Sequence, residues 1–209
     1  MVLMPKVNFY KLDNDKKGKI IDAAYTEFLE HKHNYKKASV KRISKAADIS
    51  IGSFYEYFYD KDDLFLYLIK KIISKKHDHV FIEDNTLKEN FLRLAKISED
   101  DSLLENKERE LLNILLYDNE DIKRKFYFNY AIDNFMELNT EKLYKDKEKG
   151  LIHDFVDLEF ASFLFTTIEY NIIRYFELKN ITDHGERQKI AENFIELIFK
   201  GIYKDGNVK

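Results

Sequence analysis

The stretch from Ser44 to Leu64 reads SKAADISIGSFYEYFYDKDDL and crowds five aromatic residues and a glycine into the length of two short helices. Its two adjacent alanines let neighbouring helices approach closely. Asp48, which follows them, is one of the few residue types that tolerate a positive φ in a sharp turn. Two helices joined by a turn of three or four residues form a helix-turn-helix. The stretch therefore predicts this motif, with Asp48 in its turn.

Short polar side chains mark where three helices begin. Asp13 or Asn14, Ser39 and Ser50 are each followed by apolar residues at helical spacing, and such side chains cap the first N–H groups of a helix. We expect the first helix to fade around residues 31–34. The other two are expected over residues 40–46 and about 51–58.

The helix predicted at about residues 51–58 has two distinct faces. Phe54 and Phe58 are four residues apart, so they share one side, which we expect in the core. Gly52 lies off that side, and its lack of a side chain lets the backbone approach another molecule closely. Because the second helix of a helix-turn-helix enters the major groove of DNA, Gly52 is predicted to lie against phosphates and bases.

Hydroxyl groups and a lysine surround this glycine. Ser53, Tyr55 and Tyr57 can donate to phosphate oxygens without adding charge. Lys61 stands in the first turn of the next helix, after its predicted cap Asp60. There the helix dipole and the ammonium both favour a phosphate. These four side chains are therefore predicted to contact the DNA backbone.

Residues 17 to 69 resemble the DNA-binding domain of the TetR family of bacterial transcriptional regulators. The shared motifs are, in order, IIDAAxxxF at residues 20–28, SVxxI at 39–43, AADIS at 46–50, IGSFYEYF at 51–58 and KDDL at 61–64. The resemblance implies contacts with the DNA backbone by Ser53, Tyr55, Tyr57 and Lys61. It implies positions near the bases or the adjacent phosphates for Lys41, Ile51 and Glu56. The full predicted DNA-binding set adds Gly52 and the two caps, Ser39 and Ser50.

The sequence departs from the family pattern in three places. The usual glycine after the first helix is absent, and the segment from His31 to Tyr35 is longer than usual. Asp48 replaces the turn glycine, and Ala38 replaces the threonine that commonly precedes Ser39. We expect loop geometry to absorb the first two changes. The third either removes one backbone contact or moves the cap to Ser39.

Composition limits the fold and the kinds of chemistry. The 209 residues are 44% apolar and 35% charged, with one proline, six glycines and no cysteine. So few helix breakers predict an all-α fold. The lack of cysteine excludes disulfides, thiolate catalysis and cysteine-ligated zinc. The longest apolar run, residues 64–69, is far shorter than the ~20 residues that cross a bilayer. We therefore expect a soluble cytoplasmic protein with no membrane partner.

Charge divides unevenly along the chain. Residues 1–80 hold 16 basic and 11 acidic residues, a net of +5, whereas residues 81–209 hold 19 and 27, a net of −8. A basic front on an acidic body suits an anionic partner bound at one end. We expect a three-helix helix-turn-helix DNA-binding domain at residues 1–60. A larger helical bundle for effector binding and dimerisation is expected at residues 61–209.

Six further helices are expected in the bundle. Their ranges are 61–81, 86–97, 102–116, 119–147, 155–176 and 187–203, with a solvated charged end at 145–149. The last two are apolar on more than one side and must be buried on more than one side. A second copy of the chain is the economical cover, so we predict a twofold homodimer. Its predicted interface residues are Phe165, Ile172, Phe176, Phe194 and Ile198.

Polar residues lie among aromatic ones in the long helices of the bundle. The resemblance implies that a small effector binds there and releases DNA by changing the spacing of the two DNA-binding domains. Ligand pockets are mostly apolar with a few placed polar groups. The predicted lining is Tyr127, Tyr130, Asn134, Phe163 and Thr167, and the abundance of Phe and Tyr favours an apolar or aromatic effector. The alternative, that these residues simply pack in the core or lie on the surface, stays open.

Other kinds of site find little support in the residues. His31 and His33, like His77 and His79, are two apart, and residues i and i+2 of a helix diverge. We expect all four on the surface, with no metal bound. No phosphate-binding glycine loop, nucleophile elbow or catalytic-triad spacing occurs. We therefore predict neither an enzyme nor a cofactor.

The predicted function is a ligand-responsive transcriptional repressor that binds a pseudo-palindromic DNA operator as a dimer. Two rival functions stay open. A helical carrier of a lipophilic molecule would bind its ligand tightly and DNA only nonspecifically. A regulator controlled by a protein partner would have a fully packed bundle with no usable cavity.

Overall fold

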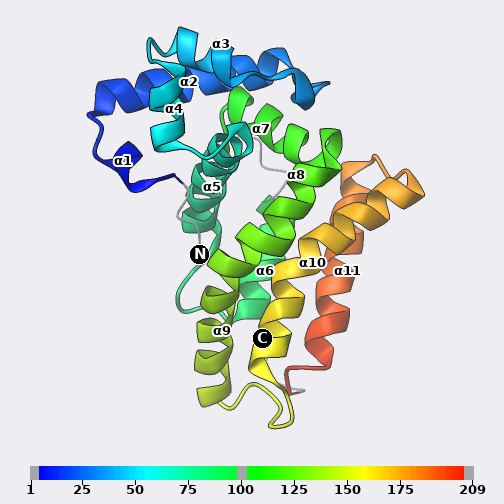
Figure 1. Ribbon diagram of the computed structural model, residues 1–209. Coiled ribbons are helices and arrows are strands. Elements are labelled where there is room, and N and C mark those ends of the chain that lie inside the picture. Colours follow the sequence, from blue (N-terminus) through cyan, green and yellow to red (C-terminus); the bar gives the residue numbers. More distant parts are fainter. Residues whose placement is uncertain (1–4, 98–102, 205–209) are drawn as a thin grey trace. The chain divides into compact units, whose positions relative to one another are not determined.

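The computed structural model describes residues 5–97 and 103–204, and almost all of their regular structure is helical (Figure 1). In chain order the helices are α1 (Val7–Tyr10), α2 (Asn14–Glu30), η1 (Tyr35–Lys37), α3 (Val40–Ala46), α4 (Ile51–Tyr57), α5 (Lys61–Val80), α6 (Leu87–Ile97), α7 (Asn106–Asn113), η3 (Ile114–Asp118), α8 (Glu120–Lys125), η4 (Phe126–Ala131), α9 (Ile132–Glu148), α10 (Leu158–Lys179) and α11 (His184–Lys200). The predicted all-α fold class is confirmed. Among the described residues, no helix has both the length and the apolarity to span a membrane.

The chain packs as two compact units. The first takes its described residues from Met1–Lys76 and Ser102–Lys123, and the second from His77–Asp101 and Arg124–Lys209. These units follow contacts within the chain, whereas the predicted division at residues 1–60 and 61–209 follows roles. The division by role stays a prediction.

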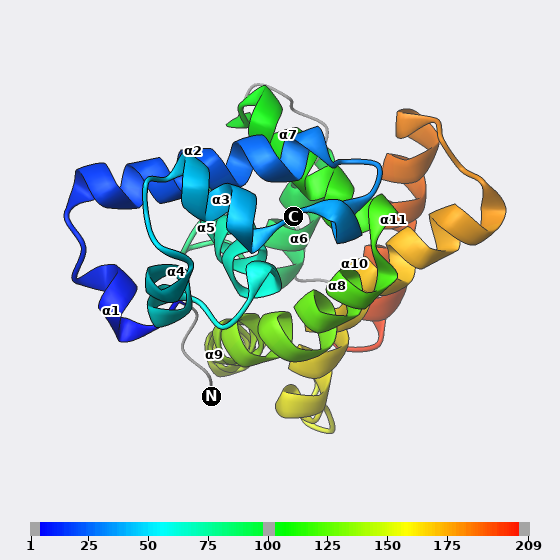
Figure 2. The same cartoon turned by 45° about the horizontal axis from the view of Figure 1, so that its top comes forward.

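Three helices of the first unit, α2, α3 and α4, form the head, with α3 packed between the other two (Figure 2). Its core contains the fully buried side chains of Phe28, Ile43 and Phe54. Asp48 has a φ of 54°, as the turn requires. The predicted helix-turn-helix is present, with Asp48 at its bend.

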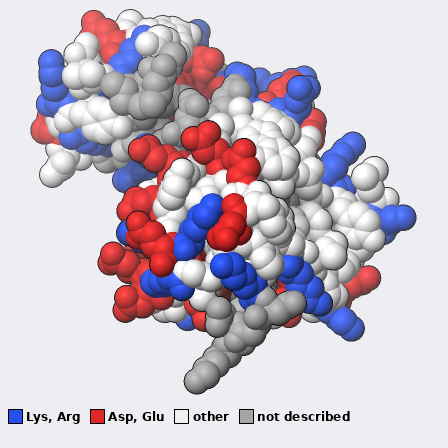
Figure 3. Space-filling model, turned by 90° about the horizontal axis from the view of Figure 1, so that it is seen from below, with Lys and Arg blue, Asp and Glu red and all other residues white. Residues whose placement is uncertain are grey.

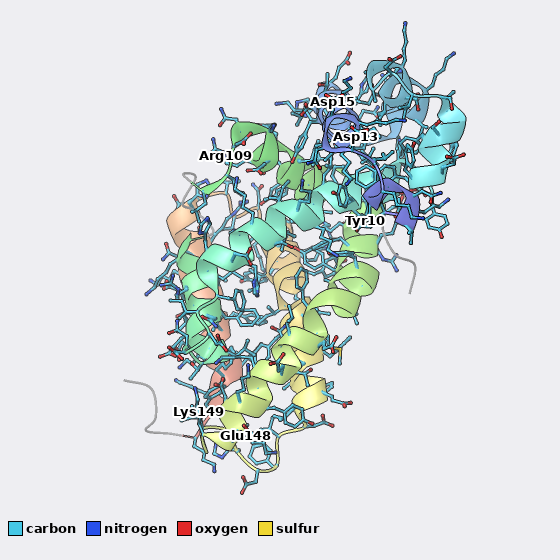
Figure 4. The ribbon with its side chains drawn as sticks, turned by 90° about the vertical axis from the view of Figure 1, so that its left-hand side faces the viewer. Tyr10, Asp13, Asp15, Arg109, Glu148 and Lys149 are labelled. Atoms are coloured by element: carbon cyan, nitrogen blue, oxygen red, sulfur yellow. The ribbon has the colours of Figure 1, made fainter. Side chains whose placement is uncertain are left out.

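Helix caps in this unit follow the sequence closely. The carboxylate of Asp13, labelled in Figure 4 at the start of α2, accepts from the backbone N–H three residues on at 2.8 Å. Ser50 and Asp60 accept in the same way at 2.9 and 2.8 Å, ahead of α4 and α5. These side chains satisfy N–H groups that have no partner inside the helix. The predicted caps by Asp13, Ser50 and Asp60 are confirmed.

The core of the second unit is built mainly by α6, α9, α10 and α11. The rings of Phe165 and Phe199 stack with centroids 4.4 Å apart, and the Phe91 ring lies 5.5 Å from that of Phe165. Each of these rings comes from a different helix. Aromatic contacts of this kind join α6, α10 and α11 around one core.

The charged end of α9 differs from its prediction in one residue. Asp146 is fully buried and accepts from the Leu87 N–H at 2.8 Å and from the Tyr203 hydroxyl at 2.5 Å. Its neighbours Glu148 and Lys149 are exposed, as expected (Figure 4). Basic and acidic side chains also intermingle on the surface of this unit (Figure 3). The alternating charges predicted a solvated helix end. Asp146 instead lies on the side of α9 that faces the core, beside its two donors.

The helix predicted over residues 119–147 is present at residues 120–148, but it is not α-helical throughout. Its middle, η4, is a π-helix that separates α8 from α9, and η3 before α8 is a second π-helix. In a π-helix the backbone bonds run from i to i+5, which shifts all later side chains around the axis. A periodicity of 3.6 residues cannot predict this shift, and π-helices occur frequently at functional sites.

Candidate nucleic-acid interface

Helix α4 has the two faces that its sequence predicts. Phe54 is fully buried, and so is Phe58, the residue that immediately follows the helix. Ile51, Gly52 and Tyr55 are exposed on the other side. The remaining predicted contacts that are exposed are Lys41 on α3, Ser50 and Glu56.

Tyr57 corrects the predicted orientation. Only 6% of this residue is exposed, and its ring lies edge-on to that of Phe9, with centroids 6.4 Å apart. The sequence placed Tyr57 away from the core, because Phe54 and Phe58 already supplied an apolar face. The sequence did not predict α1, and Phe9 of α1 buries the side of α4 that carries Tyr57.

The start of α4 is held by two serines. Ser50 Oγ accepts from the Ser53 N–H at 2.9 Å and lies 2.9 Å from Ser53 Oγ. The Ser53 hydroxyl is half-buried and already has a partner within the first turn. A phosphate would have to share it with Ser50.

The glycine in α4 is not required by the fold. A Cβ atom added to Gly52 would lie 3.6 Å from Ser50 Oγ, an ordinary van der Waals contact. The residue also lies in a regular helix, where alanine is favoured over glycine by about 1 kcal/mol. Close approach of another molecule to the exposed backbone would offset this cost.

Lys61 is placed differently from its prediction. Its Nζ donates to the carbonyl oxygens of Tyr35, Lys36 and Ala38 at 3.0, 3.0 and 2.9 Å. The ammonium also lies 4.8 Å from the centroid of the Tyr35 ring. Desolvation by burial lowers the pKa of Lys61, although nearby carboxylates oppose that shift. All three N–H donors are therefore committed to the turn at η1, which leads directly into α3.

The start of α3 is capped from a different helix. Ser39 is at the predicted N-cap position, but its side chain makes no cap bond. Its backbone N–H instead donates to Glu27 Oε1 of α2 at 2.7 Å. Arg42 of α3 donates to the same carboxylate through Nε at 2.9 Å and Nη2 at 2.6 Å. Glu27 thus ties the first turn of α3 to α2, and the predicted side-chain cap by Ser39 is wrong.

This network does not resemble a metal site. Ligand atoms of Glu27, Glu30 and His31 lie within 4.8 Å of one another. The Arg42 guanidinium already neutralises Glu27, and its Nη2 lies 2.8 Å from His31 Nε2. The positive charge at this position is therefore supplied by the protein. We assign no metal to it.

The head should lose stability in acid through Glu27. Desolvation raises the pKa of this carboxyl, but hydrogen bonds from Arg42 and from the Ser39 N–H outweigh it, so the pKa is below its ordinary 4.5. A depressed pKa stabilises the folded state above the unfolded pKa and is lost as pH falls through the folded pKa. We expect this loss below about pH 4.5 in acid unfolding followed by amide exchange of α3.

Two matched variants test this acid dependence. Glu27→Gln should destabilise the head at neutral pH and remove its share of the pH dependence. Glu30→Gln, on the exposed side of the same turn, should leave both unchanged. Equal acid profiles for the wild type and Glu27→Gln would contradict the role of the carboxylate.

The structure brings together only some of the predicted ligand residues. Tyr127 and Tyr130 are both buried on η4, and the Tyr127 ring lies 5.5 Å from that of Tyr170 on α10. Thr167 is buried, and its hydroxyl donates to the Phe163 carbonyl at 3.1 Å. The side chain of Phe163 is 36% exposed and does not share this environment. The side chain of Asn134 lies outside the described residues.

A hollow of about 260 Å³ lies elsewhere, in the first unit. Its lining is polar: His33, Asn34, Tyr35, Lys36, Asp118, Asn119, Glu120 and Asp121. The Asp118 carboxylate there accepts from the Tyr35 N–H at 3.1 Å. None of the predicted ligand residues borders this hollow.

The predicted dimer residues turn inward more than expected. Phe165 is 1% exposed and Phe176 is also buried, so both pack within their own chain. Ile172, Phe194 and Ile198 are half-buried against the same core. For Phe165 and Phe176 the reason is that the apolar pattern does not show which side of the helix faces the core. For Ile172, Phe194 and Ile198 a place in the interface stays a prediction. The exposed apolar residues of α10 are instead Phe160, Phe163, Leu164, Tyr175 and Leu178.

Glu27, Lys6 and Phe9 contact the helices of the head, and sequence reasoning missed all three. Glu27 carried a signal, because it is an acid on the apolar side of α2, next to Phe28. Lys6 and Phe9 lie in a four-residue helix and its cap, too short for any periodicity to show.

The helix-turn-helix also matches a known protein family in sequence. Residues 20–68 match the sequence model of the family described as bacterial regulatory proteins, tetR family. This match covers α3, α4 and most of α2, with the start of α5. No curated protein matches the chain.

Several solved structures share the fold over most of their length. SmeT, the repressor of the Stenotrophomonas maltophilia multidrug efflux pump SmeDEF, is 14% identical with a TM-score of 0.59, covering 94% of this chain and 96% of its own. NalD of Pseudomonas aeruginosa, the secondary repressor of the MexAB-OprM pump, is 20% identical with a TM-score of 0.56, covering 93% and 100%. A putative TetR-family regulator from Rhodococcus sp. is 12% identical with a TM-score of 0.62, covering 89% and 99%.

The likeness to these structures shows the shared fold, and the sequence match falls on the helix-turn-helix itself. Over residues 20–68 the chain therefore carries the N-terminal domain of the tetR family of bacterial regulatory proteins.

Proposed function

We propose that this protein is a cytoplasmic repressor that binds a pseudo-palindromic DNA operator as a homodimer and leaves it when a small molecule binds the second unit. We propose no catalytic role. The observation that carries the proposal is the exposed face of α4. It presents Ile51, Gly52 and Tyr55 to solvent, and the fold itself gives no reason for the glycine.

The dimer would form through the apolar stripe on α10, which we define as Phe160, Leu164, Tyr175 and Leu178. At 100° per residue these four side chains fall within about one sixth of the helix circumference. Phe160 is 60% and Leu178 is 70% exposed. Exposed apolar side chains in such a row mark an interaction surface. A twofold axis through the stripe would pair it with its own copy and give the protein two heads.

The effector site would lie beside η4. Tyr127 and Tyr130 supply buried aromatic surface there, and Tyr170 of α10 contacts Tyr127. A π-helix interrupts α8 and α9 at this place, and such interruptions are frequent at functional sites. SmeT, which shares this fold, has been solved as a complex with triclosan. For this chain we propose an apolar or aromatic effector as well.

Release of DNA would follow from linkage. A ligand that prefers the conformation unable to bind DNA lowers the affinity of the protein for DNA. DNA lowers the affinity for the ligand by the same factor. The coupling typical of such systems is about 1–3 kcal/mol, or about 5- to 150-fold.

Selection of bound duplexes from a random DNA pool tests the proposal. We expect a twofold-symmetric consensus, because each head of a dimer reads one half-site. A consensus without symmetry would contradict dimeric binding. Absence of any sequence preference would contradict the function as a whole and would favour a carrier of small molecules.

A further inference from the structure

Helix α4 ends with carbonyl groups that have no partner within the helix. It has seven residues, and the last four carbonyls of any α-helix have no partner within it. The Phe58 N–H donates to the Phe54 carbonyl at 2.9 Å. The carbonyls of Tyr55 and Tyr57 are left for partners outside the helix.

Lys6 supplies those partners from the N-terminal segment. Its backbone N–H donates to the Tyr57 carbonyl at 2.9 Å, and its Nζ donates to the Tyr55 carbonyl at 2.8 Å. The ammonium also lies 4.0 Å from the centroid of the Tyr59 ring. A cation at the C-terminal end of a helix is favourable in itself. One residue therefore caps the end of α4 and contacts the ring that follows it.

Phe9 anchors this cap in the core of the first unit. It is fully buried, with its ring centroid 4.9 Å from that of Phe58 and 5.3 Å from that of Tyr67 on α5. The Phe9 N–H donates to the Lys6 carbonyl at 2.9 Å, which closes the turn between the two residues. Figure 2 shows α1 beside α4. The anchor thus fixes where the Lys6 donors point.

We propose that residues 6–10, the N-terminal clamp, position α4 for DNA and that Lys6 is a positioning residue within the clamp. The inference rests on the proposed DNA-binding function. Because the ammonium donates to the Tyr55 carbonyl and lies over the Tyr59 ring, the proposal assigns its role to the helix and not to a phosphate. Loss of the cap lets the last turn of α4 fray, and Tyr55 and Glu56 in that turn lose their fixed position against DNA.

The variant that tests the clamp is Lys6→Met, which keeps the length of the side chain but removes its charge and its donors. Affinity for the selected duplex should fall about tenfold, the equivalent of about 1.4 kcal/mol, because the charged hydrogen bond that holds the last turn of α4 is lost. The slope of log affinity against log salt should not change, because no phosphate contact is lost. Lys6→Arg, which keeps the charge and the donors, should restore most of the affinity.

The matched control is Lys11→Met, which removes the same charge from an exposed residue just after α1. Equal affinity losses in Lys6→Met and Lys11→Met would mean a general charge effect and would overturn the clamp. So would a shallower salt slope in Lys6→Met alone, since it would indicate a phosphate contact.

Hydrogen exchange separates failure of the clamp from failure of the proposed function. Without DNA, the amides of residues 54–58 should exchange faster in Lys6→Met than in the wild type or Lys11→Met, and those of α2 should not change. Unchanged exchange at residues 54–58 would overturn the clamp whether or not the protein binds DNA. A wild type without sequence preference would overturn the proposed function, and the exchange result would still decide the clamp.

Discussion

Lys61→Met should lower operator affinity about 100-fold and destabilise the head by roughly 3 kcal/mol, the largest effect we expect from one side chain. Methionine fills a similar volume but offers no donor to the carbonyls of Tyr35, Lys36 and Ala38. Charged hydrogen bonds contribute about 1.5–3 kcal/mol each, and a half-buried lysine keeps part of its hydration. The turn at η1 would loosen, and α3 begins directly after it.

The salt dependence of binding separates this role from the one predicted by sequence. A phosphate contact by Lys61, one in each half-site, would lower the slope of log affinity against log salt by about 0.9 per contact when removed. A positioning role leaves the slope unchanged while affinity and the urea midpoint both fall. Lys36→Met is the control. It removes an exposed charge from the same turn, and the backbone carbonyl of residue 36 can still accept from Lys61. A reduced slope with an unchanged urea midpoint in Lys61→Met would favour the phosphate contact.

The double variant Leu164→Asp, Tyr175→Asp should convert the dimer into monomers and lower operator affinity at least about 100-fold. Both residues lie in the apolar stripe, and two charges per chain would face two more across a twofold axis. Linked heads bind as one unit, with a gain that typically reaches 10²–10⁴-fold, and separate heads lose it. Sedimentation velocity at micromolar concentration measures the first effect and fluorescence anisotropy with the selected duplex the second.

An exposed leucine off the stripe provides the control for this variant. Leu138→Asp on α9 introduces the same charge at a residue that is 48% exposed. We expect it to remain dimeric and to bind DNA like the wild type. A wild type that sediments as a monomer, or a double variant that remains a dimer, would contradict the stripe as the interface.

The head could be predicted almost to the residue, because short-range chemistry decides its boundaries. Ser39 and Ser50 stand just before α3 and α4, and Asp48 adopts the positive φ that the turn needs. The cap by Ser50 and the turn at Asp48 depend on neighbours within about four residues along the chain. The start of α3 is the exception, because Glu27 of α2 caps it. The pattern of apolar residues then requires only that Phe54 and Phe58 face inward.

Features that depend on distant partners could not be predicted. Lys61 has the sequence position of a phosphate ligand, yet the carbonyls that it binds lie 23 to 26 residues earlier in the chain. Tyr57 is buried by a ring 48 positions away, on a helix too short to show periodicity. Asp146 has the same character, because its donors come from the start of α6 and the end of the described chain. In each case the sequence shows which side chain carries the polar or charged group. Only the folded structure shows which distant residue that side chain contacts.

Gly52→Ala tests the central claim most directly, because the same substitution should raise stability and weaken DNA binding. The fold has room for the added methyl group, so the helix should gain up to about 1 kcal/mol. Gly18→Ala on α2, where a Cβ would meet nothing within 4 Å, should give a similar gain and leave DNA binding unchanged. In anisotropy titrations with the selected duplex, we predict at least about a tenfold loss of affinity for Gly52→Ala, the equivalent of 1.4 kcal/mol. Affinity equal to that of the wild type and Gly18→Ala would contradict the account, since the backbone at Gly52 would then not approach DNA.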